Sequence, residues 1–392
     1  MNSVSVLHIG KFFPPSVGGI ENFTGDLLPA LRLHHVEATA LVHEDPSLSN
    51  SDFDDDSAHE LVNRVPCYGR LLYAPISPGF PWALRKMIRK HKPDILHIHM
   101  PNTSAFAALL LPCARKIPWV IHWHADVVSS VIDSRMALAY AFYRPWEQRL
   151  LARAKAIIAT SERYLLSSEP LRRWQAKCTV IPLGMNPDRL PEPDLLPMAS
   201  GEKIWGSGQC RVLAVGRLTY YKGHEVLIRA AATQNDLRVV IVGDGEQRAR
   251  LQKLVVQLGV EDRVDLVGFK SSDILHALIA TCDCLCLPSI ERTEAFGLVL
   301  LEAMRYGKPV VASDVTGSGM GWVVQDGETG LLVYPEDAAE LASTLQKLAD
   351  DQSLCKRLGN GGRERFFKMF HIDPVAVQVK TLYQKIIKER QN

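Results

Sequence analysis

Short apolar runs alternate with amphipathic stretches throughout the first half of the chain. Helical periodicity lies between the runs, for example over Asn22–Leu33 and Trp82–His91. The apolar or β-branched runs expected to form strands are Val4–Ile9, Ala38–Val42, Ile95–His99, Trp119–His122, Ala156–Ala159 and Thr179–Pro182. Strands of this kind alternating with helices predict a parallel sheet covered on both faces.

A second series of strands follows in the other half of the chain. It comprises Arg211–Val215, Leu237–Val242, Val264–Val267, Cys284–Leu287, Pro309–Ala312 and Gly330–Val333. Between the two series, residues 187–208 hold four prolines, Gly201, Gly206 and Gly208, which is typical of an interdomain linker. We therefore predict two α/β domains over residues 1–186 and 209–370, joined by that linker, and a closing helix within residues 371–392.

Length and composition agree with two globular domains. The chain has 392 residues, 47% of them hydrophobic and 22% charged, so extended disorder is not expected. The net charge is only +2, but residues 61–185 contain 18 Lys and Arg against 6 Asp and Glu, an excess of 12. Such an excess suits anionic lipid or a phosphorylated acceptor. Nucleic acid is the competing partner, and no nucleic-acid motif accompanies the charge.

The eight cysteines show no disulfide framework. Cys282, Cys284 and Cys286 alternate with other residues of a short apolar run, which favours a buried strand over a metal site. The N-terminus begins a strand instead of a signal segment, and no run approaches 18 apolar residues. We expect a cytoplasmic protein with reduced thiols.

Two carboxylates eight positions apart, Glu294 and Glu302, bracket the most informative segment of the chain. Glu294 is expected in the loop after the strand Cys284–Leu287, and Glu302 two turns into the following helix. Ligands of open parallel sheets bind beyond the carboxyl ends of the strands, and a helix start attracts anions. The spacing alone is equally compatible with a surface helix that carries two acids.

The segment from Glu294-Ala295-Phe296-Gly297 to Glu302 resembles the E-x7-E signature of glycosyltransferase family 4, which has the GT-B fold. Shorter matches extend the resemblance over nearly the whole chain. They are Gly18-Gly19-Ile20-Glu21, Val215-Gly216-Arg217-Leu218 before Lys222-Gly223, and Gly243-Asp244-Gly245. The resemblance implies two Rossmann-like domains facing each other across a cleft, with the closing helix packed back on the first domain.

The resemblance also implies roles for residues near a nucleotide-sugar donor. Arg217 and Lys222 would contact the pyrophosphate, where two cations stabilise a leaving group, although they could be solvated loop charges. Gly18 and Gly19 would lie against the donor phosphate and sugar, with a plain tight turn as the alternative. Glu21 would then be structural and close the helix start.

The remaining donor contacts come from three loops of the second half. Gly243, Asp244, Gly268 and Phe269 suit the nucleoside pocket. Glu302 would accept hydrogen bonds from the ribose hydroxyls, and Glu294 would contact the sugar. Backbone amides of Phe296, Gly297, Leu298 and Val299 would meet the sugar and phosphate.

Histidines mark the acceptor side. In His122-Trp123-His124-Ala125-Asp126, strand alternation points His122 and His124 to one side and places Asp126 past the strand end. A zinc site would need a further ligand that this segment does not supply. By the resemblance, His124 would lie close to the transferred sugar as a catalytic residue. We interpret His99 as half core and half wall of the acceptor cleft.

Two segments depart from this picture. The D-x-D motif at Asp52–Asp56 is the metal signature of a different glycosyltransferase fold, and it occurs here in a Ser-rich acidic stretch that is expected to be a solvated loop. The family's Gly-Gly-x-x-Glu is replaced by Gly317-Ser318-Gly319-Met320-Gly321-Trp322, which lacks the acid. A variant loop could tune donor choice.

The resemblance implies a retaining hexosyltransferase, and we expect it to need no metal and no cofactor because Arg217, Lys222 and helix termini would neutralise the diphosphate. Its partners would be a GDP- or UDP-linked sugar, with mannose as the first guess, and a saccharide or lipid-linked acceptor in cell-surface polysaccharide synthesis. A nucleotide-sugar epimerase and a non-catalytic carbohydrate- or nucleotide-binding subunit are the alternatives. The helix from Trp82 also carries Arg85, Lys86, Arg89, Lys90 and Lys92, with Leu84 and Ile88 as further apolar anchors, which predicts peripheral contact with an anionic membrane.

Overall fold

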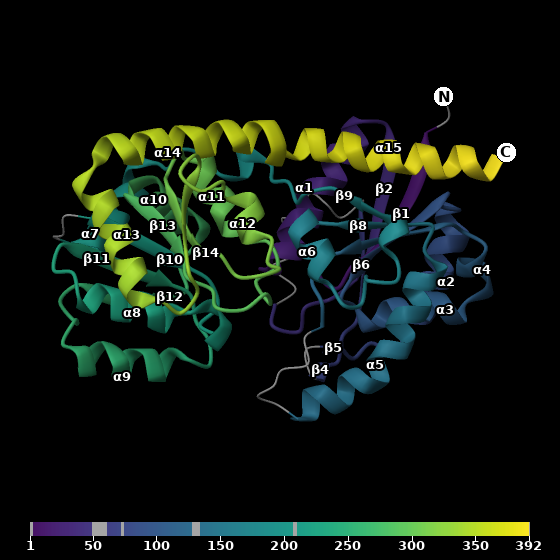
Figure 1. The fold of residues 1–392 in the computed structure, drawn as a ribbon. Coiled ribbons are helices and arrows are strands. Elements are labelled where there is room, and N and C mark those ends of the chain that lie inside the picture. The colour runs from purple at the N-terminus through teal and green to yellow at the C-terminus, as the bar shows by residue number, and fades with distance from the viewer. Residues whose placement is uncertain (1–2, 49–60, 72–73, 128–133, 207–209, 392) are drawn as a thin grey trace. The chain divides into compact units, whose positions relative to one another are not determined.

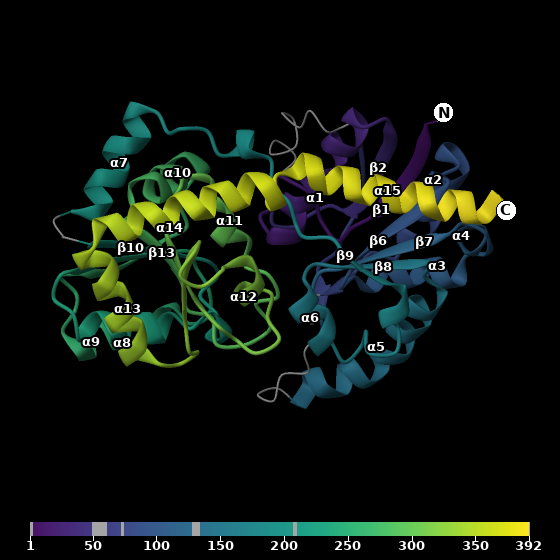
Figure 2. The ribbon, with the colours of Figure 1, turned by 45° about the horizontal axis from the view of Figure 1, so that its top comes forward.

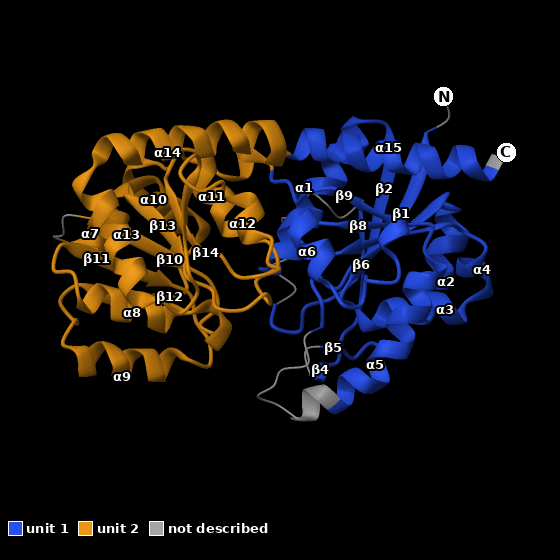
Figure 3. Ribbon diagram, viewed as in Figure 1, with its two compact units in different colours: residues 1–185, 372–392 blue, residues 186–371 orange. Residues whose placement is uncertain are grey.

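A computed structural model describes residues 3–48, 61–71, 74–127, 134–206 and 210–391. The chain divides into two compact units, residues 1–185 with 372–392 and residues 186–371 (Figure 3). Each unit is an α/β structure built on a parallel sheet, as the alternating pattern predicts. The D-x-D motif at Asp52–Asp56 lies outside the described residues.

Unit 1 contains a seven-stranded sheet with strand order β3-β2-β1-β6-β7-β8-β9 (Figure 1). The strands are β1 (Val4–Ile9), β2 (Val36–His43), β3 (Val62–Val65), β6 (Ile95–Met100), β7 (Trp119–Trp123), β8 (Ala156–Ala159) and β9 (Cys178–Val180). All neighbours pair in parallel, so their carboxyl ends share one edge. Every residue of β6 and β7 is buried.

The helices of unit 1 connect and cover these strands. They are α1 (Gly19–Leu33), α2 (Phe80–His91), α3 (Ala107–Leu110), α4 (Pro112–Arg115), α5 (Ser134–Arg153), α6 (Glu162–Ser167) and α15 (Ile372–Gln391). The last of these, α15, lies beside α1 in both views (Figures 1 and 2) and buries Val375, Val379 and Tyr383. The closing helix therefore packs on the N-terminal unit.

Unit 2 contains a six-stranded parallel sheet with strand order β12-β11-β10-β13-β14-β15. The strands are β10 (Cys210–Val215), β11 (Leu237–Val242), β12 (Val264–Gly268), β13 (Cys284–Leu287), β14 (Val310–Ser313) and β15 (Gly330–Val333). The sequence order reverses between β10 and β13, and ligands of open α/β sheets bind at such a switch point.

The helices of unit 2 follow the same alternation. They are α7 (Leu195–Trp205), α8 (His224–Ala232), α9 (Arg248–Leu258), α10 (Ser272–Thr281), α11 (Leu298–Arg305), α12 (Met320–Val323), α13 (Ala338–Asp350) and α14 (Gln352–Arg365). A π-helical turn, Phe366–Phe370, continues α14. The strands match the predicted runs to within two residues, because continuous apolar runs mark strands buried on both faces.

Two parts of the chain differ from the sequence prediction. The structure adds strand β3 and a short antiparallel pair, β4 (Arg70–Leu71) and β5 (Ala74–Pro75), which are too short or too polar to stand out. Half of the predicted linker, residues 195–205, is helix α7 of unit 2. Its Pro197 lies in the first turn, where proline is tolerated, and Trp205 is buried with its indole N–H donating to Thr281 Oγ1 at 2.9 Å.

Candidate active site

A buried ion pair lies at the carboxyl edge of the unit 2 sheet. Lys222, at the end of a 3₁₀ turn after β10, places its Nζ 2.5 Å from Glu294 Oε2, and both side chains are only 13% exposed. Burial opposes the charged form of Lys222, but the charge and hydrogen bond of Glu294 outweigh it and raise the pKa of the ammonium group. The predicted pyrophosphate cation and the predicted sugar-binding acid are therefore in direct contact.

Arg217 occupies the loop that follows β10, but it faces solvent. Its guanidinium lies 3.5 Å from Glu246 Oε2, and the two side chains are 54% and 51% exposed. An exposed pair at this distance contributes little to stability. Of the two predicted phosphate contacts, Lys222 is therefore the one held in a fixed, buried position.

Gly243 brings the loops after β10 and β11 into backbone contact. Its φ is +138°, and a Cβ at this position would lie 2.0 Å from the Gly216 carbonyl oxygen. Only glycine fits there. The close approach positions the exposed Asp244 beside the Arg217 loop, while Gly268 and the exposed Phe269 end the adjacent strand β12.

The segment from Glu294 to Glu302 is anchored by the loop that departs from the family pattern. Ser318 is fully buried, and its hydroxyl donates to the Glu294 carbonyl oxygen at 2.5 Å. Gly319 N–H donates to the Ala295 carbonyl at 2.9 Å. The variant loop thus fixes the backbone of Glu294, which the sequence did not reveal.

Helix α11 begins at Leu298, directly after Gly297, which as the N-cap residue has no side chain to cap the helix. The amides of Leu298 and Val299 therefore lie in the first turn, where backbone N–H groups have no intrahelical partner. Glu302 is the fifth helical residue, about one turn into the helix and not two. The Phe296 ring is buried against Phe370, so its backbone alone is placed to meet a ligand.

In unit 1, the Gly18-Gly19 loop follows β1 and leads into α1. Helix α1 begins at Gly19, three residues before the predicted start at Asn22, with Gly18 at its N-cap. A Cβ on Gly18 would lie 2.2 Å from Glu21 Oε2, so the Glu21 carboxyl group packs against the glycine. Burial raises the pKa of this carboxyl group. Glu21 closes the helix start, in agreement with a structural role.

Histidines fill the interior of unit 1 at the carboxyl ends of its central strands. The His122 and His124 rings stack with centroids 4.3 Å apart, which confirms that they point to one side. His99 joins them from β6, with its Nδ1 2.9 Å from His124 Nε2. His8 and His97 lie alongside from β1 and β6, and all five rings are buried.

Sequence reasoning overlooked His8 and His97 and placed His99 partly in the cleft wall. The available signal was strand register, because β1 pairs His8 with His97 and β6 pairs His99 with His122. Buried polar side chains usually have a hydrogen-bond partner, so a histidine inside an apolar strand run indicates another polar group nearby. Asp126 is outside the cluster, since its carboxylate accepts from the Trp123 indole and the Ser168 hydroxyl.

His99 supplies the third imidazole that the sequence did not offer for a metal. The ligand atoms of His99, His122 and His124 lie within 4.8 Å of one another. The three ring planes differ by only 5–17°, however, and the rings lie face to face or end to end. Imidazole lone pairs lie in the ring plane, so these three do not converge on one tetrahedral ion.

Helix α2 presents its basic residues to solvent as expected, but two predicted membrane anchors are wrong. Trp82 is 71% exposed, whereas Leu84 and Ile88 are buried. They pack inward because they share a helical face with the buried Phe80 and Met87. No helix among the described residues is long and apolar enough to cross a membrane.

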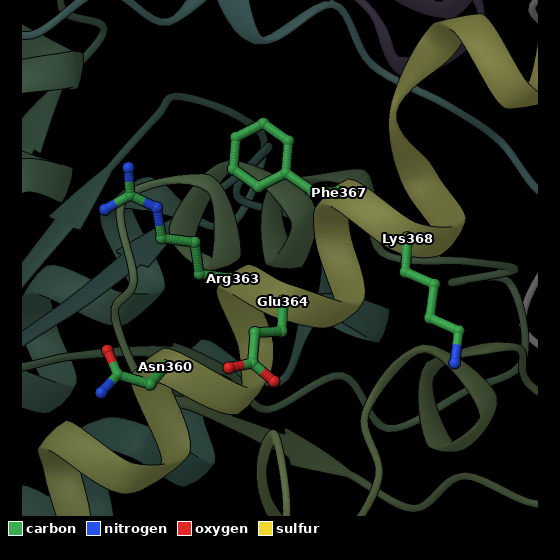
Figure 4. Close-up of a pocket in the computed structure, with 5 residues that line it drawn as sticks. All are labelled: Asn360, Arg363, Glu364, Phe367 and Lys368. Carbon is green, nitrogen blue, oxygen red and sulfur yellow. The ribbon is translucent and has the colours of Figure 1, made fainter.

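Two surface hollows of unit 2 lie away from the predicted residues. One is lined by Asn360, Arg363, Glu364, Phe367 and Lys368 of α14 and the π-helical turn (Figure 4). It is an open depression between long charged side chains. The strand-end loops described above carry the glycines, the buried ion pair and the helix N-terminus, so they form the better candidate site.

Two family models together account for most of the chain. Residues 18–184 match the glycosyl transferase 4-like domain, and residues 202–365 match the glycosyl transferases group 1 model. Each model corresponds to one of the two compact units.

Relatives match the chain over its full length. N-acetyl-alpha-D-glucosaminyl L-malate synthase from Bacillus anthracis is 32% identical over 98% of this chain and 99% of its own. O-antigen chain mannosyltransferase C from Escherichia coli is 28% identical over 98% and 99%. Sucrose-phosphate synthase from Thermosynechococcus elongatus superimposes with a TM-score of 0.80 over 98% of this chain and 100% of its own, at 26% identity. The chain therefore belongs to the GT-B glycosyltransferases of the family 4 type.

Proposed function

We propose that this glycosyltransferase is a retaining hexosyltransferase that moves a sugar from a nucleoside diphosphate to a saccharide or lipid-linked saccharide. The observation that carries the proposal is the buried Lys222–Glu294 ion pair at the switch point of the unit 2 sheet. A charged pair in this position offers a cation for phosphate and an acceptor for sugar hydroxyls. No cofactor is required in this proposal.

Donor binding would exchange the partners of this pair. A diphosphate attracts the Lys222 ammonium group, and the sugar hydroxyls take its place on Glu294. Negative charge grows on the departing diphosphate as the glycosidic bond breaks, so a fixed cation stabilises the transition state more than the ground state. Lys222, Arg217 and the N-terminus of α11 would supply this stabilisation without a metal ion.

The other contacts follow from the same edge of the sheet. Glu302 would accept hydrogen bonds from the ribose, with Gly243, Asp244, Gly268 and Phe269 lining the nucleoside pocket. His124 of unit 1 is proposed to contact the transferred sugar as a neutral hydrogen-bonding group, since burial lowers the pKa of its imidazole. A front-face route, in which the departing phosphate takes the acceptor proton, fits retention of configuration.

Mannose is the first candidate for the sugar, and the E. coli relative named as an O-antigen chain mannosyltransferase supports that choice. The same relative supports a role in cell-surface polysaccharide synthesis. We further propose that unit 1 contacts anionic membrane from the cytoplasmic side through α2. The exposed Trp82 and the exposed cations of that helix support this proposal.

A panel of nucleotides and nucleotide sugars tests the donor assignment. A ligand that binds the folded state raises the melting temperature, so GDP, UDP and their sugar conjugates can be ranked by thermal shift. Turnover with the best donor and saccharide acceptors should then give a product with the donor's anomeric configuration by NMR. An inverted anomer would refute retention, and absence of any nucleotide response would refute donor binding.

Donor incubated without acceptor distinguishes the epimerase alternative. An epimerase would convert the donor under these conditions, whereas a transferase would leave it intact apart from slow hydrolysis. A binding subunit without catalysis would give the thermal shift but no product with any acceptor. Activity that survives a chelator would support metal independence, and loss restored by manganese would contradict it.

A further inference from the structure

Three of the five buried histidines of unit 1 form a continuous hydrogen-bonded chain. His8 Nδ1 lies 3.0 Å from His99 Nε2, and His99 Nδ1 lies 2.9 Å from His124 Nε2. The chain crosses from β1 through β6 to the residue that follows β7. It ends at His124 on the carboxyl edge, where the proposed function places the transferred sugar.

The ring geometry shows true in-plane hydrogen bonds. The centroids of His8 and His99 are 5.3 Å apart and those of His99 and His124 are 5.2 Å apart, with planes inclined by 25° and 15°. Each separation equals the length of an N···N hydrogen bond plus the distance from each ring's centroid to its bonded nitrogen. The rings therefore lie end to end. Imidazole N–H groups and lone pairs lie in the ring plane, so the two contacts are aligned for hydrogen bonding.

The two remaining rings stack on the chain without joining it. His97 lies face to face with His99, with centroids 4.7 Å apart and planes 2° apart, and its Nδ1 bonds the Tyr383 hydroxyl group. His122 stacks on His124, and neither of its nitrogens has a hydrogen-bond partner among the described residues. His122 is therefore a natural control for the chain, similar in burial but outside the hydrogen-bonded path.

All three chain imidazoles are neutral at physiological pH, because burial depresses their pKa values, that of His99 to about 3. A neutral imidazole has one N–H donor and one acceptor nitrogen. His99 must therefore donate to one neighbour and accept from the other. The outer nitrogens, His8 Nε2 and His124 Nδ1, have no partner in the described part of the chain that would fix the direction.

We propose that His8, His99 and His124 act as one linked tautomeric unit, in which His8 and His99 are positioning residues that set whether His124 donates or accepts at Nδ1. In one state all three rings carry the proton on Nδ1, and in the other all three carry it on Nε2. Reversal takes one proton in at one end of the chain and releases one at the other, so no net charge is left inside. The consequence for catalysis rests on the proposed function, whereas the linkage itself does not.

Long-range ¹⁵N–¹H NMR of the full-length protein labelled with ¹⁵N-histidine measures the linkage, because the two neutral tautomers give different nitrogen shifts. Variants His8→Phe, His99→Phe and His124→Phe assign the three rings. The wild-type rings should share one tautomer, and a bound nucleotide sugar should shift all three or none. Mixed tautomers along the chain, or a tautomer change confined to His124, would overturn the proposal.

Activity gives the second readout. His99→Phe keeps the stacked ring but removes both chain bonds, and kcat should fall about tenfold with the donor KM little changed. His122→Phe should leave both near the wild-type values. Equal losses in the two variants would overturn the positioning role. If His99→Phe does not fold, His8→Phe replaces it in this test. Loss of the His8–His99 hydrogen bond should allow His99 and His124 to adopt tautomers that differ from those of the wild type.

Zinc separates this proposal from a metal centre in the same cluster. In calorimetry with zinc sulfate, the wild-type protein should show no stoichiometric zinc binding that is lost in His99→Phe. Zinc binding that requires His99 would overturn the proposal. If the tautomers are linked but the protein has no transferase activity, the linkage stands and the proposed function is refuted. The two failures are therefore distinguishable.

Discussion

The two units differ in whether charged or neutral side chains lie at the carboxyl edge of their parallel sheets. In unit 2 the carboxyl edge of the sheet holds a charged pair, Lys222 and Glu294, in hydrogen-bond contact. In unit 1 the corresponding edge leads into five buried imidazoles that burial keeps neutral. A parallel sheet thus offers its strand ends to either kind of chemistry, and the residue types placed there decide which.

The difference has a physical cause. A buried ion pair is stable only while both partners remain, because each charge alone would lose its hydration without compensation. A neutral imidazole needs one donor and one acceptor and loses little when a partner is exchanged. Unit 2 is therefore suited to capture a charged ligand, and unit 1 to make hydrogen bonds that reverse direction.

The largest expected effect is that acid lowers the stability of unit 1 more than that of unit 2. The five histidines have folded-state pKa values below the ordinary 6.5, so below that pH the unfolded chain binds more protons than the folded one. Stability is then lost as the pH falls from 6.5 towards the folded values, by up to about 1.4 kcal/mol per pH unit for each ring that stays neutral. Hydrogen exchange at pH 5, corrected for intrinsic rates, should show strands β1, β6 and β7 opening before the sheet of unit 2.

His122→Phe is the matched control for this experiment. It removes one titrating ring that makes no hydrogen bond to any described residue, so it should weaken the acid dependence by about one proton. Acid opening that begins in unit 2, or a pH dependence unchanged by this substitution, would contradict the role of the cluster.

Lys222→Ala tests the charged edge of unit 2. It removes the proposed leaving-group cation and leaves Glu294 unpaired, so turnover should fall about 100- to 1,000-fold while donor affinity changes less. Arg217→Ala removes an exposed cation and should cost only about tenfold. Steady-state rates at saturating donor measure both, and wild-type rates in the two variants would refute the pyrophosphate role.

Glu302→Ala tests the ribose contact on α11. Loss of a charged hydrogen-bond partner should weaken nucleotide binding by roughly 1.5–3 kcal/mol, which is about 10- to 150-fold in Kd. Isothermal titration with the preferred nucleotide measures the change. Glu328→Ala, which replaces an acid in the turn before β15, serves as the control, and equal affinity in Glu302→Ala and wild type would remove Glu302 from the ribose.

The last prediction concerns the surface charge of unit 1 and its contact with a membrane. Exchange of Arg85, Lys86, Arg89 and Lys90 for Glu should abolish flotation with anionic liposomes at low salt, since each cation near such a surface contributes about 1 kcal/mol. Trp82→Ala should weaken binding less, as the one exposed apolar residue of the three predicted anchors. Wild-type protein that stays unbound at low salt would favour an acceptor in solution.

The alternating pattern by itself determined every strand of the two large sheets except β3, because buried parallel strands must be apolar on both faces. The sequence alone also determined the Glu294–Glu302 spacing and the glycines of the strand-end loops. These are local features, each contained within one strand and the loop or helix that follows it. Helix α7 was not predicted because its proline and glycine residues are typical of linkers. Proline is also tolerated in the first turn of a helix, and glycine occurs where elements pack closely.

Only the tertiary structure decided which residues share an environment. The Lys222–Glu294 pair joins residues from different strand-end loops, and Ser318 reaches the Glu294 backbone from a third. The imidazole chain joins residues of β1, β6 and the loop after β7 through strand register, which no single segment contains. Burial of Leu84 and Ile88 likewise depends on the face that α2 turns to the sheet. Sequence periodicity fixes the elements because backbone sterics and side-chain spacing act locally, whereas partners and pKa values depend on contacts between distant segments.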